Sequence, residues 1–413
     1  MGSRDVEGPL GGRAKGVALV ELTREWAVRE DAGDPLARFR KEFVLPDGVI
    51  QLNGNSLGPL AAAVPGVLDD VVRHQWGSHL IRGWWDDGWW DAPERVGDRV
   101  GGLIGAAPGQ VVVGESTSVQ LFNALTAAIR LVPGRRVLIS DAANFPTDRY
   151  LATSAARLFD LRVVETPMAA LPEVLDRYAD EVGVVLCGAV DFRTGELWDV
   201  SGLTARIHRA GGIAVWDLSH AAGAVPVRMD ADDVDLAVGC GYKYLSGGPG
   251  APAFLYAASR HHAALDFAIT GWHAHANPFE MTDDFVPADG IARARIGTPQ
   301  ILSMLALEAA LVPLETAGVA AVRDKSVRLA EYLIALVADV DGVEVVTPRD
   351  PPRRGNHVTL RHRDAPALAE ALLRRGVITD ERPPDLLRLC LNGLYVSYTD
   401  VFDAVTHLRE VVR

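Results

Sequence analysis

Between residues 111 and 256 the sequence alternates short apolar runs with helical patterns, and this alternation restricts the possible folds more than any other feature. Val119–Arg130, Asp148–Leu158 and Leu203–Ala210 are examples of the helical patterns. The alternation predicts an α/β fold with a mainly parallel seven-stranded sheet covered on both faces. The expected strands are Val111–Val113, Arg136–Ser140, Leu161–Glu165, Val182–Cys187, Ile213–Trp216, Val234–Gly239 and Ala253–Tyr256.

The pattern changes after Thr298–Pro299, where a long helical stretch runs to about Ala338 and is expected to break or bend near Pro313 and Gly318. Shorter runs then predict a smaller α+β domain. Its expected strands are Val343–Val346, His357–Leu360, Gly376–Thr379 and Leu386–Leu391, and its expected helices are Ala365–Arg374 and Val401–Val412.

We therefore expect four parts. Residues 1–16 are Gly-rich and aperiodic, which predicts a disordered tail. Residues 17–65 form an N-terminal arm, with a helical pattern to about Phe43, that joins the small domain. Residues 66–298 form the large domain, and residues 299–413 form a connector helix and the small C-terminal domain.

Composition excludes several classes of function. The net charge of −13 argues against binding to nucleic acid or to anionic lipid. No apolar run is long enough to span a membrane, and the charged start of the chain does not fit a signal peptide. The three cysteines lie far apart, without metal-binding or disulfide spacing. We expect a cytoplasmic enzyme that acts on a small molecule.

Lysine is rare in this chain, which has 41 Lys and Arg residues but only four lysines, Lys15, Lys41, Lys243 and Lys325. Lys243 follows an apolar strand and precedes the Gly-rich segment Gly247–Gly250. A surface lysine at a strand end is the plain alternative. Strand ends of an open α/β sheet line the ligand crevice, however, and a lysine there can form a Schiff base.

Polar residues follow other predicted strands. Asp217 is either a helix cap or the carboxylate that keeps the pyridine nitrogen of pyridoxal 5′-phosphate (PLP) protonated, and His220 lies close to it in sequence. Thr117 and Ser118 open a predicted helix, where hydroxyl and N–H groups can bind phosphate or merely cap the helix. Phe145 can stack on a planar ring or simply pack.

Six segments together give a specific resemblance. The chain resembles the kynureninases, which are PLP-dependent enzymes of the transferase fold type I, from about residue 45 to the C-terminus. That resemblance implies hydrolysis of L-kynurenine to anthranilate and L-alanine by a homodimer with shared active sites. The segments are GNSLG (Gly54–Gly58), NFPTD (Asn144–Asp148), DLSHAAG (Asp217–Gly223), GYKYLSGGPG (Gly241–Gly250), GW (Gly271–Trp272) and RIGTPQIL (Arg295–Leu302).

The resemblance also implies residue roles. Lys243 would hold PLP, Tyr242 would contact the phosphate and relay a proton, and Asp217 would pair with the pyridine nitrogen near His220. Arg388 would bind the substrate α-carboxylate as a bidentate fork. The remaining expected cofactor contacts are Thr117, Ser118, Phe145, Pro146, Thr147 and Asp148, with Trp272 and Thr298 from the other subunit. Ser56 and His79 would line the aryl pocket.

Some features depart from this pattern or leave alternatives. Gly188 stands where some relatives place a polar residue. Thr298 replaces the Asn of enzymes that favour 3-hydroxykynurenine, so we expect unsubstituted kynurenine to be the better substrate. His273 and His275 lack a third ligand, and no metal is expected. A cysteine desulfurase, an aminotransferase and a non-catalytic regulator of the same fold are the alternative functions.

Overall fold

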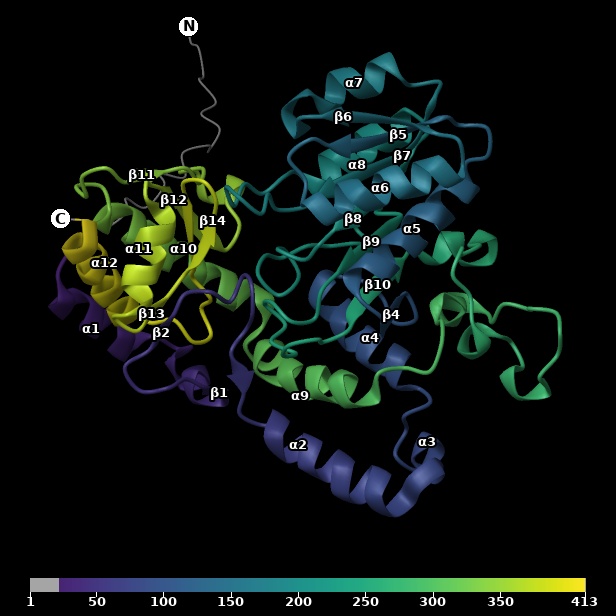
Figure 1. Cartoon of the computed structure of the whole chain (residues 1–413), viewed down its shortest axis with the longest axis horizontal. Coiled ribbons are helices and arrows are strands. Elements are labelled where there is room, and N and C mark those ends of the chain that lie inside the picture. Colours follow the sequence, from purple (N-terminus) through teal and green to yellow (C-terminus); the bar gives the residue numbers. More distant parts are fainter. Residues whose placement is uncertain (1–21, 413) are drawn as a thin grey trace, which may run out of the picture.

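The computed structural model describes residues 22–412, and it places a large α/β domain beside a smaller domain (Figure 1). The expected tail at residues 1–16 lies outside the described residues. The large domain is built on a seven-stranded sheet with the order β4-β10-β9-β8-β7-β5-β6. Its strands are β4 (Val111–Gly114), β5 (Val137–Asp141), β6 (Arg162–Thr166), β7 (Val182–Gly188), β8 (Ile213–Asp217), β9 (Leu236–Gly239) and β10 (Ala253–Ala257).

All seven strands agree with the sequence prediction to within two residues at each end. Strands β6, β5, β7, β8 and β9 run parallel, and β10 is antiparallel to both of its neighbours. The predicted mainly parallel sheet is therefore confirmed.

Both faces of the sheet are buried, and successive residues of one strand enter different hydrophobic clusters. Val111 and Val113 face one cluster, whereas Val112 faces the other. Helices α5 (Thr117–Leu131) and α6 (Pro146–Leu158) cover the face of Val112. Helices α4 (Ala92–Ile104), α7 (Leu171–Arg177) and α8 (Val200–Arg209) pack on the opposite face. Burial on both faces explains why the strands read as continuous apolar runs.

The connector consists of two helices, α9 (Ile301–Ala317) and α10 (Val319–Leu336), which meet at an angle of 77°. The bend lies at Gly318, whose φ of +79° suits glycine. The break expected near Pro313 and Gly318 is thus found at Gly318, and α9 continues through Pro313. Within residues 22–412 no single helix is long and apolar enough to cross a membrane; only α9 and α10 taken together, despite their bend, pass that test of length and composition.

The small domain contains an antiparallel sheet with the order β11-β12-β15-β14 and the helices α11 (Ala365–Leu373) and α12 (Tyr398–Val412). Strand β14 was not expected. The expected strand at 376–379 exists as β13 (Val377–Ile378), but it pairs with β2 (Ile50–Gln51) of the N-terminal arm instead of joining this sheet. The sheet strands are β11 (Glu344–Val345), β12 (His357–Arg361), β14 (Asp380–Arg382) and β15 (Leu386–Cys390).

The N-terminal arm begins with α1 (Arg24–Gly33), which packs on α12, and a short 3-10 helix, Ala37–Glu42, follows. Strands β1 (Phe43–Val44) and β3 (Leu60–Ala61) then pair. The chain continues through α2 (Val64–Asp70), a π-helical extension to His79, and α3 (Gly83–Asp86). In Figure 1 this segment runs along the lower edge of the molecule.

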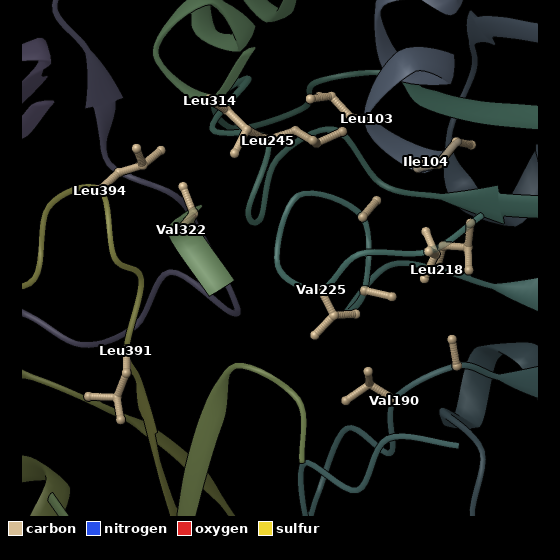
Figure 2. Packing of buried hydrophobic residues seen from close by; sticks show 14 of the residues in the cluster. Leu103, Ile104, Val190, Leu218, Val225, Leu245, Leu314, Val322, Leu391 and Leu394 are labelled. Atoms are coloured by element: carbon tan, nitrogen blue, oxygen red, sulfur yellow. The ribbon is translucent and has the colours of Figure 1, made fainter. Parts of the chain in front are cut away.

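A continuous hydrophobic core joins the two domains. Figure 2 shows Leu103 and Val225 of the large domain, Leu314 of α9, Val322 of α10 and Leu394 of the small domain within one buried cluster. Because the same cluster contains residues of both sheets, the small domain is packed firmly against the edge of the large one.

The arm is attached to the small domain by a buried ion pair. Lys325 Nζ of α10 lies 2.6 Å from Asp34 Oδ2, and both side chains are only 3% exposed. Burial lowers the pKa of Lys325, and the nearby Asp34 carboxylate opposes that shift. Lys325 is therefore a structural lysine.

Replacing Lys325 by Met would leave the Asp34 carboxylate buried without a cation. We expect the free energy of unfolding, measured by urea titration, to fall by about 3–5 kcal/mol. The double variant Lys325→Met, Asp34→Asn should recover most of this loss. Arg374→Ala, which removes the exposed pair with Glu370, serves as the control and should leave the unfolding midpoint unchanged. A loss below about 1 kcal/mol in Lys325→Met would contradict a structural role.

Candidate active site

A cavity of about 160 Å³ opens at the carboxyl ends of the central strands. Asp141 and Asp217, the last residues of β5 and β8, line it, and Lys243 enters from the loop after β9. The predicted site residues that line this cavity are Thr117, Ser118, Phe145, Thr147, Asp148, Asp217, His220, Tyr242 and Lys243.

The loop that carries Lys243 depends on close backbone packing. A Cβ at Gly241 would collide with the Pro252 carbonyl, and a Cβ at Gly247 would lie 2.8 Å from Leu307 Cδ1. A Cβ at Gly58 would collide with the carbonyl oxygen of Lys243 itself. These three glycines are therefore required by packing, and they bring the backbone around Lys243 close to its neighbours.

The amine of Lys243 lies beside a neutral histidine. Lys243 Nζ is 3.1 Å from His220 Nε2. Burial lowers the pKa of His220 well below its usual value, and the positive charge of Lys243 lowers it further. An uncharged His220 can accept a hydrogen bond from the amine, which holds Lys243 in the cavity.

Two carboxylates share the floor of the cavity. Asp217 Oδ1 accepts a hydrogen bond from the Ser219 N–H at 2.8 Å. Asp148, in the first turn of α6, is buried, and its pKa is raised well above the usual range by burial and then by the charge of Asp217. One oxygen of Asp148 has no hydrogen-bond partner among the described residues. The pair can thus place one negative charge and one carboxylic acid against a bound group.

The start of α5 offers an anion site at another wall. Ser116 caps the helix by accepting from the Val119 N–H at 3.4 Å, and Glu115 turns the chain sharply with a φ of +55°. Thr117 and Ser118 line the cavity at this helix N-terminus. Hydroxyl groups and free N–H groups at a helix N-terminus suit a phosphate.

An aromatic wall completes the cavity. Phe145 packs edge-on against Phe192, with the ring centroids 5.2 Å apart, and it remains 41% exposed. Lys243 Nζ lies 6.0 Å from the centroid of the Phe145 ring. Pro146 begins α6 and does not line the cavity. The free face of Phe145 is available to a planar ring.

Arg388 lies next to the cavity wall, in β15. Its side chain is fully buried, and its guanidinium donates to the Phe192 carbonyl and contacts Asp380. Ser56 Oγ is 3.1 Å from Arg388 Nη2. Burial lowers the pKa of Arg388 to about 10, so the group keeps its positive charge at neutral pH.

Besides Ser56, Pro146 and Arg388, three further predicted residues do not line this cavity. Trp272 is 37% exposed and packs against Trp90, with the ring centroids 5.7 Å apart. Thr298 is exposed. His79 Nδ1 pairs with Asp87 at 2.9 Å at the end of the helix that follows α2. Their expected roles, two of them in the partner subunit's site, stay predictions.

Sequence reasoning missed several cavity residues. Asp141 could have been found, because it directly follows a predicted strand, as Asp217 does. Asp191 and Phe192 lie in the loop after β7, where the sequence gives no periodic signal. Burial raises the pKa of the Asp141 carboxyl to about 6.

These side chains fit PLP. The cavity combines a lysine amine, an acidic pair, an anion site at a helix N-terminus and an exposed aromatic face. In this arrangement Lys243 would hold the aldehyde, Asp217 the pyridine nitrogen, and Thr117 with Ser118 the phosphate. The unpartnered oxygen of buried Asp148 is explained if a polar group occupies the cavity.

Solved structures share the fold of this chain. An apo cysteine desulfurase from Thermococcus onnurineus NA1 superposes with a TM-score of 0.80 at 16% identity, covering 91% of this chain and 98% of that chain. A C-DES mutant with glycine covalently linked to its PLP cofactor gives a TM-score of 0.79 at 14% identity, covering 90% of this chain and 98% of that chain. These similarities establish PLP-dependent fold type I.

Two proteins found by sequence comparison have a higher sequence identity to this chain than these solved structures have. The kynureninase of Deinococcus radiodurans is 45% identical over 390 residues, which cover 92% of this chain and 94% of that protein. The kynureninase of Burkholderia pseudomallei is 41% identical over 401 residues, covering 94% and 95%. Residues 322–408 match the model of the kynureninase C-terminal domain. With similarity over almost the whole length, the chain belongs to the kynureninase family.

Proposed function

We propose that this chain hydrolyses L-kynurenine to anthranilate and L-alanine with PLP as cofactor. The observation that carries the proposal is the meeting of Lys243, Asp217 and Asp148 in one cavity beside the buried cation Arg388. A cofactor site next to a carboxylate-binding site suits an α-amino acid, and the kynureninase relatives extend over nearly the same length.

PLP, when bound, supplies an electron sink that allows bonds of the amino acid to be broken. Lys243 is placed to move the proton of the substrate Cα. Burial raises the pKa of Tyr242 above its usual value, so its phenol stays protonated and can donate to Cβ as anthranilate leaves. Arg388 binds the α-carboxylate, and its contact with Phe192 ties that position to the cavity wall.

The desulfurase alternative needs a reactive cysteine. Cys187, Cys240 and Cys390 are all buried, and burial raises the pKa of the Cys390 thiol to about 12. Nucleophilic attack requires an accessible thiolate. The cysteines therefore favour the kynureninase reaction over a desulfurase reaction on the same fold.

The proposed homodimer is supported by exposed apolar side chains around α3 and the segment 272–286. A single chain rarely exposes so many large apolar groups together, whereas a subunit interface covers them. In such a dimer Trp272 and Thr298 would complete the partner's site. We also place the enzyme in the cytoplasm, since its three cysteines are unpaired. The exposed residues are Trp76, Leu80, Ile81, Trp85, Phe279, Met281 and Phe285.

The proposed reaction is tested by the fluorescence of anthranilate released from L-kynurenine, and Lys243→Ala should abolish it. Of the lysines in residues 22–412, Lys243 alone lines the cavity. The variant should also lose the borohydride-reducible link to PLP. Lys41→Ala, outside the cavity, should keep full activity. A reducible PLP adduct in Lys243→Ala would show that another amine holds the cofactor.

Asp217→Ala should leave the fold intact and lower kcat by orders of magnitude. Without this carboxylate the pyridine nitrogen loses its proton, and the ring becomes a poor electron sink. Turnover and the visible absorption spectrum of the bound cofactor give the measurement. Near-normal kcat would assign the role of Asp217 to Asp148.

We also propose a preference between two substrates, L-kynurenine and 3-hydroxykynurenine. A pocket with no partner for the 3-hydroxyl group would desolvate that group at a cost of about 1–3 kcal/mol, or roughly tenfold to a hundredfold in kcat/KM. We therefore expect L-kynurenine to be preferred over 3-hydroxykynurenine. The test is to measure kcat/KM for both substrates at one pH. Equal values would show that Thr298 does not produce a preference for L-kynurenine.

A further inference from the structure

The carboxylate of Asp380 is the meeting point of three side chains from different parts of the chain. Arg388 Nη2 and Ser56 Oγ both contact Asp380 Oδ2. Arg382 Nη1 lies 2.6 Å from Asp380 Oδ1. Ser56 belongs to the loop after β2, more than three hundred residues before the other three. Asp380 thus connects the N-terminal arm with the small domain at the position of Arg388.

The strand register fixes this arrangement. Asp380 of β14 lies directly opposite Arg388 of β15 in the antiparallel ladder. Directly opposite residues place their side chains on the same face of a sheet. The Asp380 side chain is 9% exposed and the Arg388 side chain is fully buried, so water screens their attraction little.

The group carries an excess of positive charge. Two guanidinium groups, those of Arg388 and Arg382, form ion pairs with the single carboxylate of Asp380. Arg388 also reaches the carbonyl of Phe192, whose side chain lines the Lys243 cavity. Besides Asp380, the charge of Asp191 in the cavity lining acts on Arg388, so this guanidinium faces both the Asp380 group and the cavity from which a substrate carboxylate would arrive.

We propose that Asp380 is a positioning residue for the substrate α-carboxylate. It holds the Arg388 guanidinium and the Ser56 hydroxyl in one orientation before substrate arrives, so that binding does not have to order them. The inference rests on the proposed function, because it takes Arg388 as the partner of the substrate carboxylate.

The test uses the PLP-loaded enzyme and two small probes. L-Alanine carries an α-carboxylate, whereas ethylamine is the same amine without it. Asp380→Asn keeps the size of the side chain and removes its charge. We expect the dissociation constant of L-alanine, read from the visible spectrum of the bound cofactor, to rise about tenfold or more, with ethylamine binding unchanged. KM for kynurenine should rise by a similar factor, with kcat within about threefold.

Matched variants separate positioning from general damage. Asp385→Asn removes a partly exposed carboxylate that pairs with Arg361 at 3.1 Å, and it should leave both probes unaffected. Arg388→Lys should weaken the binding of L-alanine at least as much as Asp380→Asn does. A lysine ammonium cannot make the two parallel hydrogen bonds that a guanidinium makes to a carboxylate. If Asp380→Asn does not fold, as shown by thermal melting, Asp380→Glu keeps the charge and should weaken L-alanine while sparing ethylamine.

Three results would overturn the inference. Unchanged L-alanine binding would show that Asp380 does not position the fork, and tighter binding would show that Asp380 competes with the substrate for Arg388. Equal weakening of L-alanine and ethylamine would mean damage to the cofactor site and would also contradict it. Failure of the proposed function appears elsewhere, as the absence of anthranilate from the unmodified enzyme, because neither probe requires carbon–carbon cleavage.

Discussion

Burial of the central sheet on both faces is the constraint on which the site depends. A parallel strand covered by helices on both sides has no place for a charged side chain except at its ends. Strand β5 ends in Asp141 and β8 in Asp217, and Lys243 follows the end of β9. Because neighbouring parallel strands end at the same edge, groups far apart in sequence meet in one cavity.

Burial of individual side chains then determines the protonation of two cavity residues, His220 and Asp148. Burial keeps His220 neutral beside Lys243, and it raises the pKa of Asp148 near Asp217. Burial of Asp148 and then the negative charge of Asp217 both favour the protonated form of Asp148. The result is one negative charge for a pyridine nitrogen and a neutral acceptor for the amine. Neither property belongs to any one of these residues alone.

The same physical reasoning explains what the sequence could predict. The seven strands of the large sheet are predictable because double-sided burial demands continuous apolar runs, and strand-end residues such as Asp217 and Lys243 follow from them. The sequence analysis assigned no bounds to helix α4, in which Gly97 and Gly101 weaken the helical pattern. A Cβ at Gly97 would collide with the backbone at Val111, so this glycine is needed for close packing of helix and strand.

Strand β14 illustrates the limit of local patterns. Its residues Asp380, Glu381 and Arg382 are all charged. They form a strand because their backbone pairs with the edge of β15. Strand β13 likewise depends on β2 from the other end of the chain. Tertiary pairing overrides local preference at β14, whereas at β13 it decides only which partner the locally predicted strand takes. Asp380 could not be recognised from the sequence, since its relation to Arg388 exists only through this register.

The small domain also shapes the cofactor cavity through the loop after β7. The hydroxyl of Thr359 donates to the Arg193 carbonyl at 2.6 Å, and Arg388 donates to the carbonyl of Phe192 in the same loop. Phe192 in turn packs against Phe145, whose free face borders the cavity. The guanidinium proposed to bind the substrate carboxylate and the ring wall are therefore linked by two direct contacts. The small domain therefore helps to fix both the proposed carboxylate site and the aromatic wall of the cavity.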